Sequence, residues 1–117
     1  MSPVQAVSRQ VVLRAIPVGM RRRFDPGAAG ELDATFELRV TGGGEQRYAV
    51  RIADHRCTVR RGGAPEATAH VRISAGDIAR LASGAVRWPE LLAGKRLTLT
   101  GDPFLALRFP MLFRFGR

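Results

Sequence analysis

Apolar and polar residues alternate one by one in Leu32-Asp33-Ala34-Thr35-Phe36-Glu37-Leu38-Arg39-Val40. Successive side chains of an extended strand point to opposite faces. This period of two therefore places the five apolar residues on one face and the four polar residues on the other. The stretch predicts a half-buried β-strand.

The same alternation returns three times downstream. Residues 48–52, 57–59 and 69–73 each carry an apolar residue at every second position. The turn signals between these stretches are residues 41–44, Asp54-His55 and residues 62–65. Short turns join successive strands into antiparallel hairpins. We therefore expect a four-stranded antiparallel meander with one apolar face and one arginine-rich face.

The elements after the meander begin at a capping residue or near a proline and end at a glycine. They are a helix from Ser74, with Asp77 in a capping-box position, to Gly84, a helix from Trp88-Pro89 to Gly94, and a strand around Leu97 and Leu99. The whole pattern predicts an α+β fold. Its sheet should have five strands and be mostly antiparallel.

The last segment of the sequence is apolar on nearly every side. Gly101-Asp102-Pro103 is a strand exit, an N-cap and a first-turn proline, which together predict a final helix. Over residues 103–115 only Arg108 and Arg114 have polar side chains. A helix without a polar face is buried on several sides or meets another apolar body. We expect a ligand, a partner protein or a membrane to cover it.

The first 20 residues are expected to form an N-terminal helical extension of a single domain over residues 1–117. Apolar residues recur there at helical spacing, and Pro17 should end or kink the helix. An arginine-bearing, acid-free start is also typical of organellar transit peptides, and that alternative stays open. Cys57 is the single cysteine, which favours a reducing compartment, and we expect a cytoplasmic protein.

The net charge of +9 comes mainly from the two ends of the chain. Residues 1–24 hold five arginines and residues 103–117 hold three, with no acidic residue in either segment. Basic charge mixed with apolar residues suits an anionic membrane surface, although two solvated basic helices would show the same pattern. We expect one basic rim that faces a membrane or another anion, formed by Arg21, Arg22, Arg23, Arg108 and Arg114.

No residue pattern indicates catalysis, a metal or a cofactor. His55 and Cys57 would share a strand face, but a metal site needs further ligands and only His70 remains. The glycines at 42–44 lack the Lys-Ser/Thr that follows in a phosphate-binding loop. The acidic residues stand singly at caps and turns. We expect a protein that is not an enzyme and that has no metal and no cofactor.

In order and spacing, these elements resemble the sterol carrier protein 2 family of lipid-binding domains over about residues 21–113. The pieces are Asp33-Ala34-Thr35-Phe36-Glu37-Leu38, the hairpin over 48–59, Ala69-His70-Val71-Arg72-Ile73-Ser74 with Asp77-Ile78 and Leu81, Gly84 with Trp88-Pro89, Gly94-Lys95-Arg96-Leu97, and Gly101-Asp102. The resemblance implies a twisted five-stranded sheet that is covered on one face by helices. It also implies an apolar tunnel between sheet and helices for a fatty acid, an acyl-CoA, a sterol or an isoprenoid-tailed molecule. It further implies that the protein binds or transfers such a lipid. Some bacterial relatives look like accessory factors of quinone synthesis.

Apolar residues of the inner sheet face and the helical layer are the candidates for contact with such a lipid. They are Phe36, Leu38, Ile52, Ile78, Leu81, Leu92, Leu97, Leu99, Phe104, Leu107, Phe109, Met111, Leu112 and Phe113. For the sheet residues, ordinary core packing is the competing interpretation. We expect a cavity of several hundred cubic ångströms, the size typical of ligand sites.

Two other function classes stay open. In one, the apolar C-terminal helix docks on a partner enzyme of quinone or lipid metabolism. In the other, the arginines bind nucleic acid and Phe24, Phe113 and Phe115 stack on its bases. An affinity for nucleic acid that falls steeply as the salt concentration rises would indicate this second class. Co-purification with another subunit would indicate the docking module.

Overall fold

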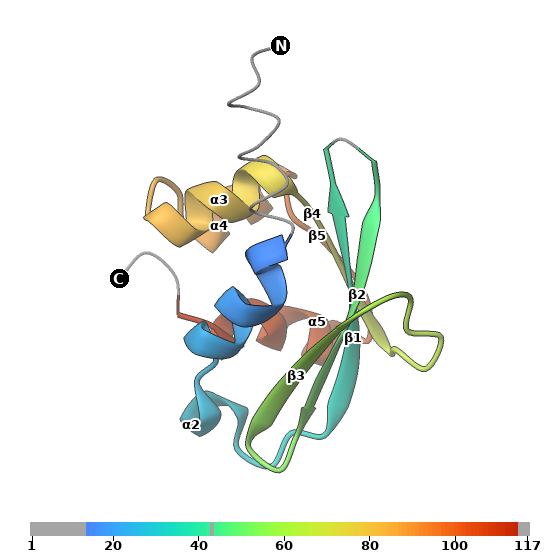
Figure 1. Cartoon of the computed structure of the whole chain (residues 1–117). Helices are drawn as coiled ribbons and strands as arrows, with labels where there is room; N and C mark the ends of the chain where they lie inside the picture. Colours follow the sequence, from blue (N-terminus) through green and yellow to red (C-terminus); the bar gives the residue numbers. More distant parts are fainter. Residues whose placement is uncertain (1–13, 43, 115–117) are drawn as a thin grey trace.

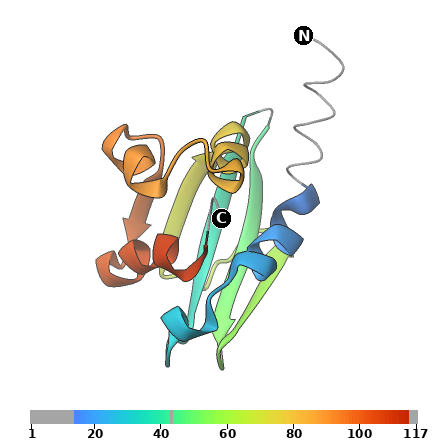
Figure 2. The ribbon, with the colours of Figure 1, turned by 90° about the vertical axis from the view of Figure 1, so that its left-hand side faces the viewer.

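The chain folds into an open five-stranded sheet with helices on one face (Figures 1 and 2). The computed structural model describes residues 14–42 and 44–114. The strands are β1 (Ala34–Thr41), β2 (Gln46–Ala53), β3 (Arg56–Arg61), β4 (Ala69–Ser74) and β5 (Thr98–Gly101). The helices are one over residues 14–23, α2 (Pro26–Ala29), α3 (Ala75–Ser83), α4 (Trp88–Ala93), α5 (Pro103–Arg108) and the 3-10 helix η1 (Phe109–Leu112). Within these described ranges no helix has the length and apolar character to cross a bilayer.

The strand order is β3-β2-β1-β4-β5, with one parallel pairing among antiparallel ones. The α+β class and the mostly antiparallel sheet are confirmed. The meander is wrong, because β4 lies beside β1 and parallel to it, with Phe36 opposite Ala69 and Val40 opposite Ile73. Strand β1 is therefore central, and its Phe36 and Val40 side chains are fully buried.

The connection from β3 to β4 crosses the sheet on the side away from the helices (Figure 1). Ala64 in this connection is buried, and its amide donates a 3.1 Å hydrogen bond to Glu37 Oε2 on that face of β1. The Thr68 amide then donates to the Thr35 carbonyl at 3.3 Å. Residues 62–65 thus open a crossover rather than a hairpin turn, because a buried carboxylate anchors them above the central strand.

Several turn and cap signals of the sequence are confirmed. Ser74 Oγ accepts a hydrogen bond from the Asp77 amide at 3.1 Å. Gly84 ends α3 in the left-handed conformation with a φ of 81°. Asp54 and His55 both have positive φ, as a two-residue hairpin turn of type I′ requires.

Gly101 shapes the turn from β5 into α5. Its φ is 91°, and a Cβ atom there would overlap the carbonyl oxygen of Thr68. The Asp102 amide donates to that carbonyl at 2.8 Å. Asp102 Oδ1 caps α5 by accepting from the amides of Phe104 and Leu105 at 2.9 and 3.3 Å. The predicted strand exit and N-cap are confirmed, and the close approach explains why glycine stands at 101.

The last helix is shorter than the sequence predicted. Helix α5 ends at Arg108, and η1 follows it with Pro110 as its second residue. Proline has no amide hydrogen and so cannot continue the α-helical hydrogen bonds. Phe113 then takes an extended conformation and forms a β-bridge with Phe24. The chain end therefore folds back onto the N-terminal part of the domain.

Pro17 does not end the N-terminal helix, which continues through it to residue 23. A proline within a helix costs as much as about 3 kcal/mol. Ile16 and Met20 are buried in the core, and such burial contributes about 1.5–3 kcal/mol per side chain. Tertiary packing therefore outweighs the local break. Most of the predicted extension, residues 1–13, lies outside the described residues.

Candidate functional site

A cavity of about 220 Å³ lies between the inner face of the sheet and the helices. Figure 2 shows the helix over residues 14–23, α3 and α5 in front of that face. The cavity is lined by Ala15, Ile16, Gly19, Met20, Arg23, Leu38, Val71, Ile73, Ile78, Ala79, Leu81, Ala82, Trp88, Leu97, Phe109 and Pro110. Its volume is below the several hundred cubic ångströms expected from the sequence.

The cavity wall is apolar, and Arg23 is its single ionisable residue among those that the structure describes. Arg23 is half-buried, and its Nη1 donates to the Gly19 carbonyl at 3.3 Å. A guanidinium at the edge of an apolar space favours a carboxylate or phosphate there. The described wall has no hydroxyl, thiol, imidazole or carboxylate that could act as a nucleophile or a base.

Small residues create the space, and the sequence reasoning missed them. Ala15 and Gly19 stand four residues apart on the helix over residues 14–23, and Ala79 and Ala82 stand three apart on α3. Residues at these spacings share one helix face. Within each helix, the two small residues therefore leave space on the face that lines the cavity. This spacing of small residues was a signal present in the sequence.

Five of the predicted lipid-contact residues do line the cavity. They are Leu38, Ile78, Leu81, Leu97 and Phe109. They come from β1, from α3, from the segment before β5 and from η1. The tertiary fold thus brings together part of the predicted set and adds the helix over residues 14–23, which contributed none of the predicted contacts.

Six other predicted residues belong to the hydrophobic core and not to the cavity wall. Phe36, Ile52, Leu112 and Phe113 are buried, and Leu92 and Leu99 pack against the core as partly buried residues. Phe36 contacts Phe109 edge-on, with 5.1 Å between the ring centroids.

Phe104, Leu107 and Met111, also predicted as lipid contacts, do not line the cavity. Their exposed fractions are 82%, 58% and 64%. The short α5 and the turn at Pro110 direct Phe109 inward, so these three residues remain on the outside. They form an exposed apolar stripe.

The five predicted anion-facing arginines do not form one free rim. Arg21 and Arg22 are exposed, whereas Arg108 Nη2 donates to the carbonyls of Ala28 and Ala29 at 3.0 and 3.1 Å. Those bonds attach α5 to α2, so Arg108 has a structural role.

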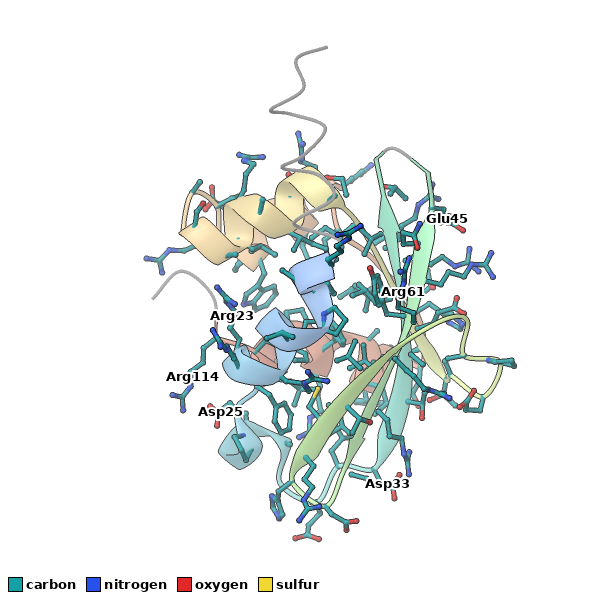
Figure 3. The ribbon with its side chains drawn as sticks, viewed as in Figure 1. Arg23, Asp25, Asp33, Glu45, Arg61 and Arg114 are labelled. Carbon is teal, nitrogen blue, oxygen red and sulfur yellow. The ribbon has the colours of Figure 1, made fainter. Side chains whose placement is uncertain are left out.

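Arg114 is engaged as well. Its guanidinium lies 3.3 Å from Asp25 Oδ2, and its amide donates to the Arg23 carbonyl at 2.8 Å, so Arg23, Asp25 and Arg114 meet on one side of the molecule (Figure 3). The hydrogen bond from the Ala28 amide has the largest effect on the pKa of Asp25 and lowers it. Burial opposes this shift, and the Arg114 side chain adds to the lowering. The acidic partner therefore stays ionised.

Neither His55 nor Cys57 lies at the cavity. His55 is exposed in the β2–β3 turn, with Nδ1 3.4 Å from the Pro26 carbonyl. Burial raises the pKa of the Cys57 thiol to about 11, although Arg21 opposes the shift. The described part of the chain contains no group of three or more residues suited to bind a metal.

The comparison with known families gives a match over most of the chain. The model of the SCP-2 sterol transfer family matches residues 21–114. No curated protein sequence matches this chain.

Solved structures share the fold at low sequence identity. The crystal structure of sterol carrier protein 2 like 2 from Aedes aegypti has a TM-score of 0.71 and 16% identity, covering 92% of this chain and 98% of that one. The solution structure of palmitated SCP2L2 from Aedes aegypti has a TM-score of 0.69 and 18% identity, covering 86% and 88%. The UbiJ-SCP2 ubiquinone synthesis protein has a TM-score of 0.60 and 16% identity, covering 94% and 96%.

Proposed function

Because the chain belongs to the SCP-2 sterol transfer family, we propose that it binds a lipid non-covalently in the cavity and stores or transfers it without catalysing a reaction. The observation that supports this most strongly is the cavity wall, which is apolar apart from Arg23 among the described residues. A wall without a nucleophile or a base suits retention of a molecule rather than its conversion.

The cavity has room for part of an apolar chain. A dry apolar cavity of about 150 Å³ already binds benzene, and this one measures about 220 Å³. Each buried methylene contributes about 0.8 kcal/mol, less the cost of ordering the chain. Ten buried methylenes would thus supply about 8 kcal/mol before that cost. Affinity then follows from chain length more than from any specific contact.

Arg23 favours a lipid with an acidic head group among the ligand classes considered. A fatty acid would place its carboxylate beside the guanidinium and its chain against Leu38, Ile78, Leu81 and Phe109. A sterol would leave Arg23 without an anionic partner. The fold relative described as palmitated supports the same class.

We test the proposal with a variant that fills the cavity. Ala82→Phe adds a ring to the wall, so the affinity for palmitate should fall at least about tenfold. Ala93→Phe is the matched control, because Ala93 is exposed on α4 and does not line the cavity. Titration of both folded variants with palmitate measures the effect. Equal affinity of Ala82→Phe and the parent would refute the proposal.

Arg23→Gln adds the test of the head group. It should weaken palmitate binding while leaving hexadecanol binding unchanged, since the alcohol has no charge to pair with the guanidinium. Native mass spectrometry of the purified protein would identify any lipid that it retains. We include a cytoplasmic location in the proposal, supported by the single cysteine.

A second candidate function is an accessory module of quinone or lipid metabolism. The observation that favours it is the exposed apolar stripe of Phe104, Leu107 and Met111, and one fold relative is described as a ubiquinone synthesis protein. In this role the stripe docks on a partner enzyme while the cavity holds an isoprenoid tail. Loss of cellular quinone on Phe104→Ser, with unchanged affinity of the cavity, would favour it over simple lipid transfer.

A further inference from the structure

A row of arginines crosses the outer face of the sheet, on the side away from the cavity. Arg39 of β1 lies directly opposite Arg47 of β2 and beside Arg72 of β4. Their strand neighbours Leu38 and Val71 face the core, so the arginines point outward. Like charges opposed across a sheet destabilise it. An anion bound to this row would relieve the repulsion.

Two of the three arginines already have a carboxylate partner. Arg39 Nε lies 2.9 Å from Glu37 Oε1, and Arg47 Nη2 lies 3.3 Å from Glu45 Oε2. Arg72 is exposed, and its guanidinium makes no hydrogen bond or ion pair with any residue in the described ranges. The uncompensated charge of the row therefore lies at its β4 end.

Arg72 lines a polar hollow of about 370 Å³ at that end of the row. Lys95 and Arg96 line it too, together with Thr41 and Thr98. The hollow combines three cations with neutral polar residues. It is thus lined mainly by charged and polar residues, whereas the cavity is lined mainly by apolar ones.

Asp77 is the single acidic residue lining the hollow among the described residues, and it is already paired. Its Oδ1 lies 3.0 Å from Arg80 Nη1 and its Oδ2 lies 3.0 Å from Arg96 Nε. Burial opposes ionisation of this carboxyl, but the hydrogen bonds from Arg96 and Ser74 outweigh it, so the pKa of Asp77 is lowered. The carboxylate is therefore neutralised inside the protein, and the hollow stays positive.

Lys95 stands in a backbone conformation that favours glycine. Its φ is 58°, whereas the glycine before it, Gly94, has a φ of −84°. A left-handed residue just after a helix is usually glycine, because a Cβ is strained there. The chain thus keeps a lysine at a strained position whose exposed side chain makes no ion pair within the described residues. Strain retained in this way is characteristic of functional positions.

We propose that the hollow formed by Arg72, Lys95 and Arg96 is a second binding site, for a phosphoryl group. A guanidinium matches phosphate with two parallel hydrogen bonds, and lysine adds a point charge. Ile73 lines both the hollow and the apolar cavity. The phosphoryl group therefore belongs either to the head of an amphiphile whose chain enters the cavity or to a free small molecule. The site itself does not depend on lipid binding.

The test is a titration of the full chain with inorganic pyrophosphate at low salt. Arg72→Gln and Lys95→Gly should each lower the affinity about tenfold, since each removes one charge-assisted contact. Arg60→Gln is the matched control, because Arg60 is an exposed arginine on the same sheet face that does not line the hollow. It should change the affinity less than about twofold.

Lys95→Gly separates binding from folding. Glycine adopts a φ near 58° without strain, so the thermal midpoint of this variant should equal or exceed that of the parent. A purely structural Lys95 would leave pyrophosphate binding unchanged. Loss of binding in a variant of undiminished stability is therefore specific to the site.

The two sources of phosphate are separated with a hexadecyl diphosphate and Ala82→Phe. If the head group occupies the hollow, Ala82→Phe weakens hexadecyl diphosphate and leaves pyrophosphate unaffected. If a free molecule occupies it, both probes bind Ala82→Phe as they bind the parent. The proposal is overturned if neither probe binds the parent, or if both bind Arg72→Gln and Lys95→Gly with unchanged affinity. Binding of a single-stranded oligonucleotide in place of both probes would assign the row to nucleic acid and overturn it too.

Discussion

Glu37 shows how one side chain supports the topology of the sheet. Its carboxylate accepts the Ala64 amide and pairs with Arg39 on the outer face of β1. The hydrogen bond from the Ala64 amide has the largest effect on the pKa of Glu37 and lowers it. Burial opposes this shift, but the Arg39 side chain adds to the lowering, so the pKa lies below its ordinary value of 4.5. The folded pKa is thus lower than the unfolded one. The stabilisation is complete above about pH 4.5 and is lost as the pH falls through the folded pKa.

Glu37→Gln should lower the free energy of unfolding by about 1–3 kcal/mol at neutral pH, because it weakens the partner of a buried amide. The difference from the parent should shrink as the pH falls below about 4.5. Urea denaturation at pH 7 and at pH 2.5 measures both values. Glu45→Gln is the control, since an exposed ion pair contributes about 0–1 kcal/mol. A Glu37→Gln difference of equal size at both pH values would contradict the interpretation.

At the scale of the element, α5 and η1 form one wall of the cavity and one end of the chain. Phe109 and Pro110 line the cavity, while Phe104, Leu107 and Met111 face outward. The inward contacts of this segment are therefore incomplete until the cavity is filled. A bound chain supplies the missing apolar neighbours, so η1 should be looser in the empty protein.

Hydrogen exchange tests this expectation. Residues 103–114 should gain more protection on addition of palmitate than residues 46–61, which make up the hairpin of β2 and β3. Asp102→Ala, which removes the N-cap of α5, should cost about 1 kcal/mol of stability and speed ligand release. Protection that rises evenly along the chain would mean that the segment is a fixed wall and that the lipid enters elsewhere.

At the scale of the molecule, the basic surface divides into arginines that hold the fold and arginines that are free to meet a membrane. Arg108 and Arg114 attach the C-terminal segment to α2 and Asp25, whereas Arg21 and Arg22 are exposed on the helix that borders the cavity. An arginine near an anionic surface is worth about 1 kcal/mol. We therefore propose that the membrane contact involves the N-terminal helix alone.

Replacing Arg21 and Arg22 by glutamine should weaken binding to vesicles of anionic lipid by about 2 kcal/mol and leave palmitate affinity unchanged. Co-sedimentation with phosphatidylserine vesicles at low salt measures the first effect. Arg56→Gln with Arg60→Gln removes the same charge from exposed positions of β3 and should change vesicle binding much less. Equal loss in both double variants would show that net charge alone, and no particular surface, attracts the membrane.

The sequence alone was enough to predict those features that depend on neighbours along the chain. Alternation from Leu32 to Val40 predicted which face of β1 packs on the apolar core, although Thr35 and Glu37 on the other face are buried as well. Asp54-His55 predicted the turn between β2 and β3. Asp102 predicted the N-cap of α5. Each depends on the local backbone geometry of a few residues, which the chain imposes before any tertiary contact forms.

Only the tertiary structure decided which strands pair and where the cavity lies. The parallel pairing of β1 with β4 depends on a crossover held by Glu37, and no local pattern distinguishes such a crossover from a hairpin loop. The cavity arises where Gly19 and Ala82, from helices far apart in the sequence, both lack side-chain volume beside the sheet. A void is a property of several segments packed together, so the pattern of any single segment does not contain it.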